Sequence, residues 1–291
     1  MGGIYSFMLD AALVLEGGAL RGMFTAGVLD ELMEREIEFA YVNGVSAGSL
    51  NGINYISKQK GRSRDINLDY VNDPRYLGVR NIVSNGGIFN FRFLFGELSD
   101  ELVPFDARTF FASGQRFEVV ATDCATGEAE YFEKGREAEI MRASAASSSM
   151  PVISSMIHLN GKRYLDGGIS VPIAYRRAME QGYNKVVLVL TRQAGYEKPP
   201  TSKAMKLTYA RYYRKYPTLV KRLIGVPENY NAMQKEISEL EREGRLFVIR
   251  PKKPVLISRI EKDVERLKRL YDEGCSMMQE RMKAMEEYLS R

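Results

Sequence analysis

The chain is 291 residues long, and hydrophobic residues make up 45%, an ordinary share for a globular protein that buries a core. No stretch approaches the roughly 18 apolar residues that a membrane-spanning helix needs, and two cysteines are too few for a disulfide framework. The 42 basic and 37 acidic residues leave a net charge of +5, and with no recognisable signal peptide we expect a cytoplasmic protein with free thiols.

Short apolar runs alternate with helical patterns over the first sixty residues. The run at 12–15 predicts a buried strand, and a second strand is expected over 39–45. Apolar residues recur at helical spacing over 22–36, and another helix is expected over 47–59. This repetition of strand, tight turn and helix predicts a parallel sheet with helices on its faces.

A glycine-rich loop, residues 16–22, joins the first predicted strand to its helix. Ala19 stands where a dinucleotide-binding turn would have its middle glycine, which disfavours a nucleotide, and we expect no cofactor. The successive backbone N–H groups of Gly17, Gly18 and Ala19 can instead form a nest for an anion, and Arg21 adds positive charge. Beside a nucleophile, such a nest is what an oxyanion hole requires.

The second predicted strand ends in Gly44-Val45-Ser46-Ala47-Gly48, which fits the Gly-x-Ser-x-Gly pattern of a nucleophilic serine. At a sharp turn between strand and helix the hydroxyl of Ser46 is exposed, and side chains at Gly44 and Gly48 would collide with their neighbours. The helix N-terminus also favours negative charge nearby. A tight turn without chemistry would fit the same five residues.

The sequence contains no histidine that could complete a Ser-His-Asp triad. The single histidine, His158, precedes the aspartate candidate, and a lone strand histidine is most often a surface or packing residue. Asp166, followed by Gly167 and Gly168, is the best alternative base, because partial burial near the serine would raise its pKa. Asp-Gly-Gly is also a common turn sequence, so Asp166 could lie in a turn that has no catalytic role.

The central part of the chain is less regular. Phe89, Phe91, Phe93 and Phe95 fit either a hydrophobic core or the wall of an acyl-chain pocket. The other expected elements are a hairpin over 116–133, a helix over 137–147, a hairpin around Asn160-Gly161, a helix over 171–181 and a strand over 185–191.

Pro199-Pro200 indicates a boundary, so we predict a catalytic domain over 10–195 and a mostly helical basic region over 196–291. Helices are expected near 201–216, 229–243, 258–273 and 275–290, with one strand at 245–250.

The last part of the chain is basic, with 23 basic and 14 acidic residues over 192–291. Residues 198–227 combine eight basic residues and four tyrosines with no acid, which favours peripheral contact with an anionic membrane surface. No nucleic acid is expected, because no recognised binding motif accompanies these charges. A plain solvated surface would have the same composition. Residues 1–6 also fit the weakly specific N-myristoylation pattern.

Taken in order, the glycine loop with Arg21, the Gly-Val-Ser-Ala-Gly turn and the Asp-Gly-Gly turn resemble the patatin-like phospholipases. The resemblance runs from about residue 12 to 191 and includes the small-residue stretch over 143–151. It implies a three-layer α/β/α fold with a C-terminal, mostly helical extension. Glu16 and Ala19 are mild departures, since the family usually has an acidic residue, often Asp, and a glycine there.

The resemblance also implies a function. It implies a Ser46–Asp166 dyad that cleaves the acyl esters of lipids without a metal, with the amides of Gly17, Gly18 and Ala19 in the oxyanion hole. The expected partner is therefore a lipid ester substrate. A lipid-binding protein that has lost its chemistry, or an acyltransferase that uses the same acyl-serine, remain alternatives.

Overall fold

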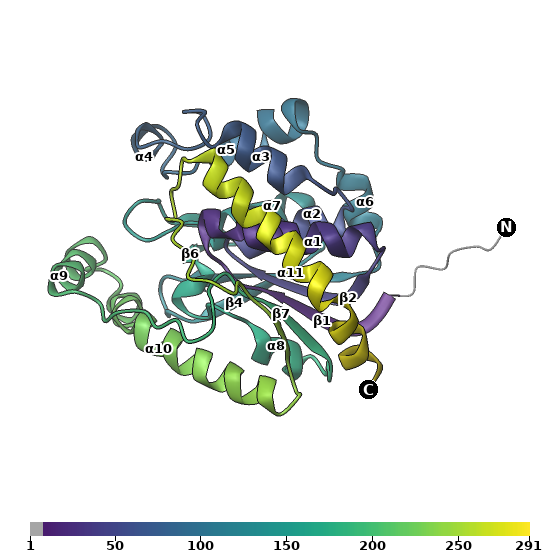
Figure 1. Ribbon diagram of the computed structural model, residues 1–291. Coiled ribbons are helices and arrows are strands. Elements are labelled where there is room, and N and C mark those ends of the chain that lie inside the picture. Colours follow the sequence, from purple (N-terminus) through teal and green to yellow (C-terminus); the bar gives the residue numbers. More distant parts are fainter. Residues whose placement is uncertain (1–7) are drawn as a thin grey trace.

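The computed structural model describes residues 8–291, so the myristoylation pattern lies outside the described residues. Helices cover both faces of one central sheet, which gives the predicted three-layer α/β/α arrangement (Figure 1). The strands are β1 (Met8–Leu15), β2 (Glu38–Val45), β3 (Arg116–Asp123), β4 (Ala129–Glu133), β5 (Ile157–Leu159), β6 (Lys162–Asp166), β7 (Val186–Val189) and β8 (Phe247–Ile249).

The sheet is mixed, with the order β5-β6-β3-β2-β1-β7-β8. β2 and β6 pair with successive segments of the same edge of β3, and β4 pairs with the opposite edge. The pairs of neighbours from β3 to β8 are parallel, whereas β4, β5 and β6 are added antiparallel. Both predicted hairpins are confirmed. Asn160 and Gly161 have positive φ angles of 48° and 77°, which the tight turn between β5 and β6 requires.

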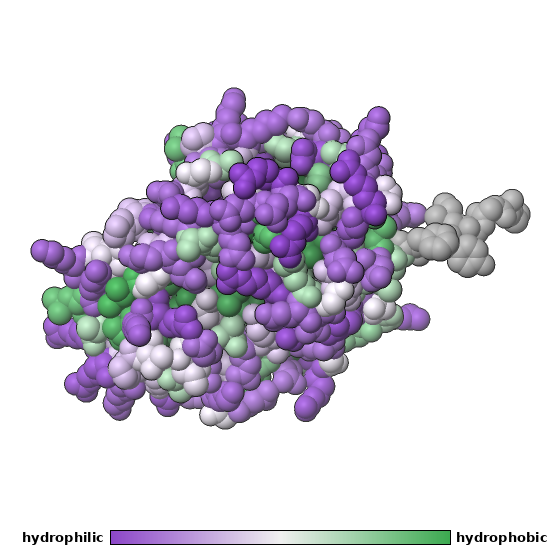
Figure 2. Space-filling model, turned by 90° about the horizontal axis from the view of Figure 1, so that it is seen from below, coloured by the Kyte–Doolittle hydropathy of each residue, from purple (hydrophilic) through white to green (hydrophobic). Residues whose placement is uncertain are grey.

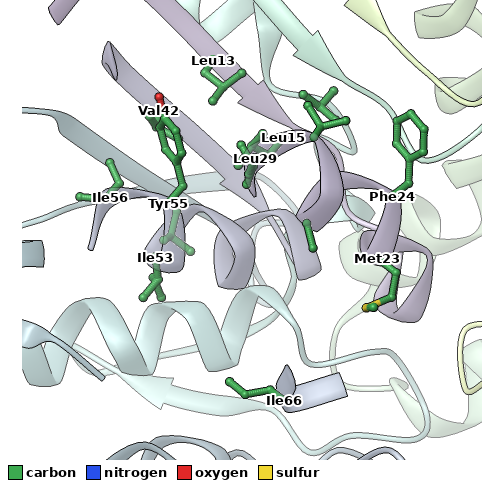
Figure 3. Close-up of a cluster of buried hydrophobic side chains, with 14 of the residues drawn as sticks. Leu13, Leu15, Met23, Phe24, Leu29, Val42, Ile53, Tyr55, Ile56 and Ile66 are labelled. Carbon is green, nitrogen blue, oxygen red and sulfur yellow. The ribbon is translucent and has the colours of Figure 1, made fainter. Parts of the chain in front are cut away.

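Alternate side chains of β1 point to opposite faces of the sheet and enter two separate cores. Leu13 and Leu15 pack with α1 (Met23–Glu34), α2 (Ala47–Ile56) and α11 (Val264–Ser290), and Figure 3 shows part of this cluster. Ala12 and Val14 pack with α8 (Tyr175–Glu180) and α10 (Pro217–Arg242) on the other face. The remaining helices are α3 (Arg62–Tyr70), α4 (Arg80–Ser84), α5 (Phe91–Phe95), α6 (Ala107–Ala112), α7 (Glu137–Ser147) and α9 (Lys203–Tyr212).

The last helix, α11, differs from the prediction of two helices over 258–273 and 275–290. It runs without a break through Gly274, because this glycine is a contact point and not a helix end. A Cβ at Gly274 would lie 2.1 Å from the carbonyl oxygen of Phe24, and one at Gly27 would lie 2.2 Å from that of Tyr271. The two glycines therefore let α1 and α11 approach closely.

The helix α10 also starts earlier than the predicted residue 229. It begins at Pro217, which suits the first turn, where a backbone N–H has no partner within the helix. Pro227 lies inside the helix without ending it. Through β8 and α11, residues after 196 share the sheet and core with the first part of the chain, and the boundary near residue 195 stays a prediction. Nowhere in residues 8–291 is a helix both long and apolar enough to cross a membrane.

Candidate active site

The ends of two strands meet on one edge of β3. Val45, the last residue of β2, pairs with Val120, and Asp166, the last residue of β6, pairs with the next residue, Ala121. Both β3 residues also pair with β4, which must therefore occupy the opposite edge. Because β2 runs parallel and β6 antiparallel to β3, their ends face each other. This register brings Ser46 and Asp166 together across 120 positions of sequence.

Ser46 has the strained backbone that the pattern predicts, with φ 55° and ψ −125°. The flanking glycines make this turn possible. A Cβ at Gly44 would lie 2.6 Å from the backbone nitrogen of Ser49, and one at Gly48 would lie 2.4 Å from the carbonyl oxygen of Leu15. No larger residue could occupy either position without moving the backbone.

Asp166 ends β6 as the sequence predicts, and its side-chain oxygen accepts the Gly168 N–H at 2.8 Å. Gly167 passes so close to β3 that a Cβ there would lie 2.2 Å from the carbonyl oxygen of Val120. Burial raises the pKa of the Asp166 carboxyl, and the hydrogen bonds that it accepts from Gly168 and from the Ser46 side chain lower it by less. The result is a carboxylate that is more basic than an ordinary aspartate and that lines the same cavity as the serine.

The glycine loop after β1 lines the same cavity as Ser46 and Asp166. A Cβ at Gly17 would lie only 2.9 Å from the Cβ of Ser46, so the loop passes directly beside the serine. Ala19 has a positive φ of 49°, which bends the loop into the next turn. The backbone N–H groups of Gly17, Gly18 and Ala19 donate to no acceptor in residues 8–291, which leaves them available to a substrate oxygen.

The buried carboxylate of Glu16 anchors this loop. In the sequence, Glu16 stood out only as a residue where the family often has Asp. Glu16 accepts hydrogen bonds from the Thr191 N–H at 2.6 Å, the Thr191 hydroxyl at 3.1 Å and the Tyr230 hydroxyl at 2.9 Å. It thereby ties the loop to the end of β7 and to α10. A glutamate at the end of an apolar strand was the available signal, since a buried acid needs such partners.

The serine-rich end of α7 positions both members of the pair. Ser147 Oγ accepts the Ser46 N–H at 2.8 Å, and the carbonyl oxygen of Ser149 accepts the Asp166 N–H at 2.9 Å. This small-residue stretch carries no motif from which its role could be predicted. Small side chains let the end of α7 lie against both turns, which suits the Ala and Ser residues over 143–149.

Ser46 lies between two cavities of different character. One, of about 360 Å³, contains Ser46, Asp166 and the glycine loop, and Arg21 lies in its wall. The other, of about 50 Å³, is apolar and shares Ser46 and Ala19 with the first. Its apolar lining comes mainly from Leu20, Met23, Leu50, Phe89, Phe91, Leu94 and Met150.

The aromatic cluster over 89–95 is thus divided between the two roles considered for it. Phe89 and Phe91 line the apolar cavity, whereas the side chain of Phe93 is buried in the core. His158 lies exposed on β5, opposite Arg163 in the hairpin, and lines neither cavity. In residues 8–291 no three His, Cys, Asp or Glu side chains form a group that could hold a metal ion.

Two protein-family models match the chain. The family model for patatin-like phospholipases matches residues 13–176, which include both strand ends and the glycine loop. A second model, described as a domain of unknown function (DUF6363), matches residues 216–290.

Individual proteins are also similar to this chain. The chain is 31% identical over 251 residues to the uncharacterized protein YjjU of Escherichia coli (strain K12), which covers 84% of this chain and 69% of that protein. It is 29% identical over 189 residues to the probable lipid hydrolase 463L of Invertebrate iridescent virus 6, covering 58% of this chain and 64% of that protein. VipD from Legionella pneumophila, a solved structure, aligns over 94% of this chain and 67% of VipD, with 13% identity and a TM-score of 0.45. By its family-model match and its similarity to YjjU, the chain belongs to the patatin-like phospholipase family.

Proposed function

We propose that this protein is a serine lipid acyl hydrolase, which cleaves carboxylic esters with Ser46 as nucleophile and Asp166 as the only acid–base partner. The observation that carries the proposal is the meeting of β2 and β6 on β3, beside amides that have no other acceptor in the described chain. Membership of the family and the similarity to a probable lipid hydrolase support a lipid substrate.

The reaction follows from the positions of these groups. The Ser46 hydroxyl attacks the ester carbonyl carbon while Asp166 accepts its proton, and the carbonyl oxygen becomes an oxyanion that the amides of Gly17, Gly18 and Ala19 stabilise. When the tetrahedral intermediate collapses, the C–O bond to the alcohol breaks and Asp166 returns the proton to the departing oxygen. Water, deprotonated by Asp166, then attacks the acyl-serine and releases the acid.

A carboxylate is a weaker base than imidazole, so its surroundings have to compensate. Burial makes the Asp166 carboxylate more basic, because it disfavours the charged form. The three unpaired amides stabilise the transition state, with each good donor contributing about 3–4 kcal/mol. The hydrogen bond from the Ser46 N–H to Ser147 leaves the oxyanion to the glycine loop, since this amide is already occupied.

The decisive experiment compares wild type with Ser46→Ala. We expect wild type to hydrolyse a short-chain p-nitrophenyl ester and to be labelled at Ser46 by a fluorophosphonate, and Ser46→Ala to lose both, with turnover at least about a thousandfold lower. Ser84→Ala is the matched control, because Ser84 is an exposed serine outside both cavities.

Other results would favour the alternatives. Folded wild type that is not labelled would indicate a lipid-binding protein without chemistry. Transfer of the acyl group to an added alcohol in preference to water would indicate an acyltransferase. Full turnover by Ser46→Ala would refute the proposed nucleophile.

We also propose that α9 contacts an anionic membrane surface. None of its side chains is buried, and Leu207 is 71% exposed although it is apolar. Lys203, Lys206 and Arg211 lie on the same helix. In Figure 1 this helix lies at the edge of the molecule, and Figure 2 shows apolar side chains gathered at that end. Exposed apolar and basic side chains together suit the boundary between headgroups and acyl chains.

Liposome pelleting tests this contact. We expect wild type to pellet with vesicles that contain phosphatidylserine, less with pure phosphatidylcholine, and less again at high salt, because added ions screen the attraction. Leu207→Ser with Lys206→Glu should weaken pelleting about tenfold or more, whereas Arg108→Glu, an exposed charge reversal on α6, should have little effect. Absence of binding, or binding insensitive to salt, would contradict the proposal.

A further inference from the structure

Four cationic side chains line the large cavity beside Ser46, and three of them come from the chain after β7. Arg21 belongs to the glycine loop, Arg192 and Lys198 follow β7, and Arg259 lies between β8 and α11. They meet there because β7 and β8 extend the sheet next to β1. These four side chains form a cationic wall of the large cavity.

These cations have no carboxylate partner. None of the four forms an ion pair with any acid in residues 8–291. Arg21 is only 8% exposed, and its Nε is buried without a hydrogen-bond partner. A buried guanidinium nitrogen without a hydrogen-bond partner is costly, and at the edge of a cavity lined by three further cations it supports a site for an anion.

The cavity has an excess of positive charge. Its lining contains two carboxylates against the four cations, and Glu16 already accepts hydrogen bonds from Thr191 and Tyr230. Burial, together with repulsion from Arg192 and Arg259, lowers the pKa of Arg21 to about 10. Burial and the neighbouring arginines lower that of Lys198 to about 8. An anion would relieve this repulsion, and a zwitterion would bring its own cation into it.

The position of the serine relates this wall to the substrate. Ser46 and Ala19 belong to both cavities, so an ester carbonyl at Ser46 would have apolar side chains on one side and cations on the other. The acyl chain fits the apolar side, and the alcohol half of the ester then extends into the cationic cavity.

We infer that the cationic cavity binds a phosphate group on the alcohol half of the substrate, and that the preferred substrates are acyl esters of phosphorylated alcohols with net negative charge. Guanidinium groups match phosphate oxygens with paired N–H donors, and the lysine ammonium adds a compact positive charge. The phosphate is bound and not cleaved: only the acyl C–O bond breaks, and the phosphorylated alcohol leaves. This inference rests on the proposed hydrolase function and deepens it.

The test measures, within each variant, the ratio of kcat/KM for a phosphate ester to kcat/KM for matched esters without net negative charge. Three esters with the same short acyl chain, kept below the concentration at which they aggregate, are compared: 1-octanoyl-glycerol 3-phosphate, 1-octanoyl-glycerol and 1-octanoyl-glycerophosphocholine. We expect wild-type kcat/KM for the phosphate ester to exceed that for each of the other two about tenfold or more. Arg259→Gln and Arg192→Gln should each lower these ratios about tenfold, because each removes charge-assisted hydrogen bonds to the phosphate.

Arg108→Gln is the matched control, since Arg108 is exposed and does not line the cavity; its ratios should equal those of wild type. Turnover that depends on Ser46 but shows no preference for the phosphate ester would overturn the inference and leave the hydrolase function intact. Unchanged ratios in Arg259→Gln and Arg192→Gln would do the same.

Two further arms complete the test. If inorganic phosphate inhibits wild type and Arg259→Gln removes this inhibition while the substrate ratios stay constant, the cavity binds a free anion and the assignment to the substrate is wrong. If no ester is cleaved, the hydrolase function fails, and thermal stabilisation by glycerol 3-phosphate tests the cavity alone. Stabilisation of wild type but not of Arg259→Gln would support the phosphate site, and no stabilisation would overturn it.

Discussion

Asp166→Asn is expected to lower kcat/KM for ester hydrolysis by about three to four orders of magnitude while the protein stays folded. Asparagine keeps the shape of the side chain, and its oxygen can still accept the Gly168 N–H, which Asp166 accepts at 2.8 Å. It cannot accept the proton of Ser46, and no histidine lines the cavity to replace it. Steady-state kinetics with the p-nitrophenyl ester, together with a melting curve, measures both parts of this prediction.

The raised pKa of Asp166 fixes the sign of two accompanying effects. Only the carboxylate can act as base, so the wild-type rate should fall about tenfold per pH unit below a pKa that lies above the ordinary value of about 3.9. A raised folded-state pKa also means that the charged form opposes folding above that pKa, a cost that disappears below the ordinary value. Asparagine carries no charge, so the variant should melt at the same or a higher temperature at neutral pH.

Two outcomes would count against Asp166 as the base. One is turnover in Asp166→Asn close to that of wild type. The other is a loss of activity accompanied by a collapse of the melting temperature, which would indicate a structural role for the carboxylate.

Gly274→Ala should destabilise the protein by about 1–3 kcal/mol, a large effect for one added methyl group. The new Cβ would lie 2.1 Å from the carbonyl oxygen of Phe24, and the obstacle is helix backbone, which cannot rotate away. α11 would have to separate from α1 and expose part of the core that they share. Urea denaturation of both proteins measures the difference in free energy of unfolding.

Gly225→Ala is the matched control, because it adds the same methyl group inside α10, where a Cβ would have no heavy atom within 4 Å. Alanine is the better helix former, so this variant should be equally or slightly more stable than wild type, by up to about 1 kcal/mol. If both variants changed stability alike, helix propensity and not the close approach of α1 and α11 would explain the result.

The sequence was most informative where chemistry restricts a few neighbouring residues. The turn around Ser46 needs glycine at both sides, so its strained backbone could be predicted from five letters. Buried strands such as 12–15 and the hairpin at Asn160-Gly161 were equally local in origin. The helical extension was also expected, although two helices, 258–273 and 275–290, were predicted where α11 runs through Gly274 without a break. Glycine ends helices and also lets them approach closely, and periodicity alone does not separate the two uses.

Contacts between segments that are far apart in the sequence could not be predicted from such local patterns. Pairing of Asp166 with Ala121, next to the end of β2, depends on strand register, which the sequence does not state. The cations of the cavity are spread from Arg21 to Arg259, and no spacing relates them. They converge because β7 and β8 lie beside β1, a property of the whole sheet. Glu16 was visible in the sequence, but its partners Thr191 and Tyr230 were not.

The register on β3 has a consequence for protein synthesis. Ser46 leaves the ribosome 120 residues before Asp166, which corresponds to roughly 6–24 seconds of translation. During that interval the nascent chain already contains the nucleophile but has no base beside it. On the proposed mechanism, the protein therefore becomes able to hydrolyse lipid esters only after β6 has paired with β3. Incomplete chains near a membrane do not cleave its lipids.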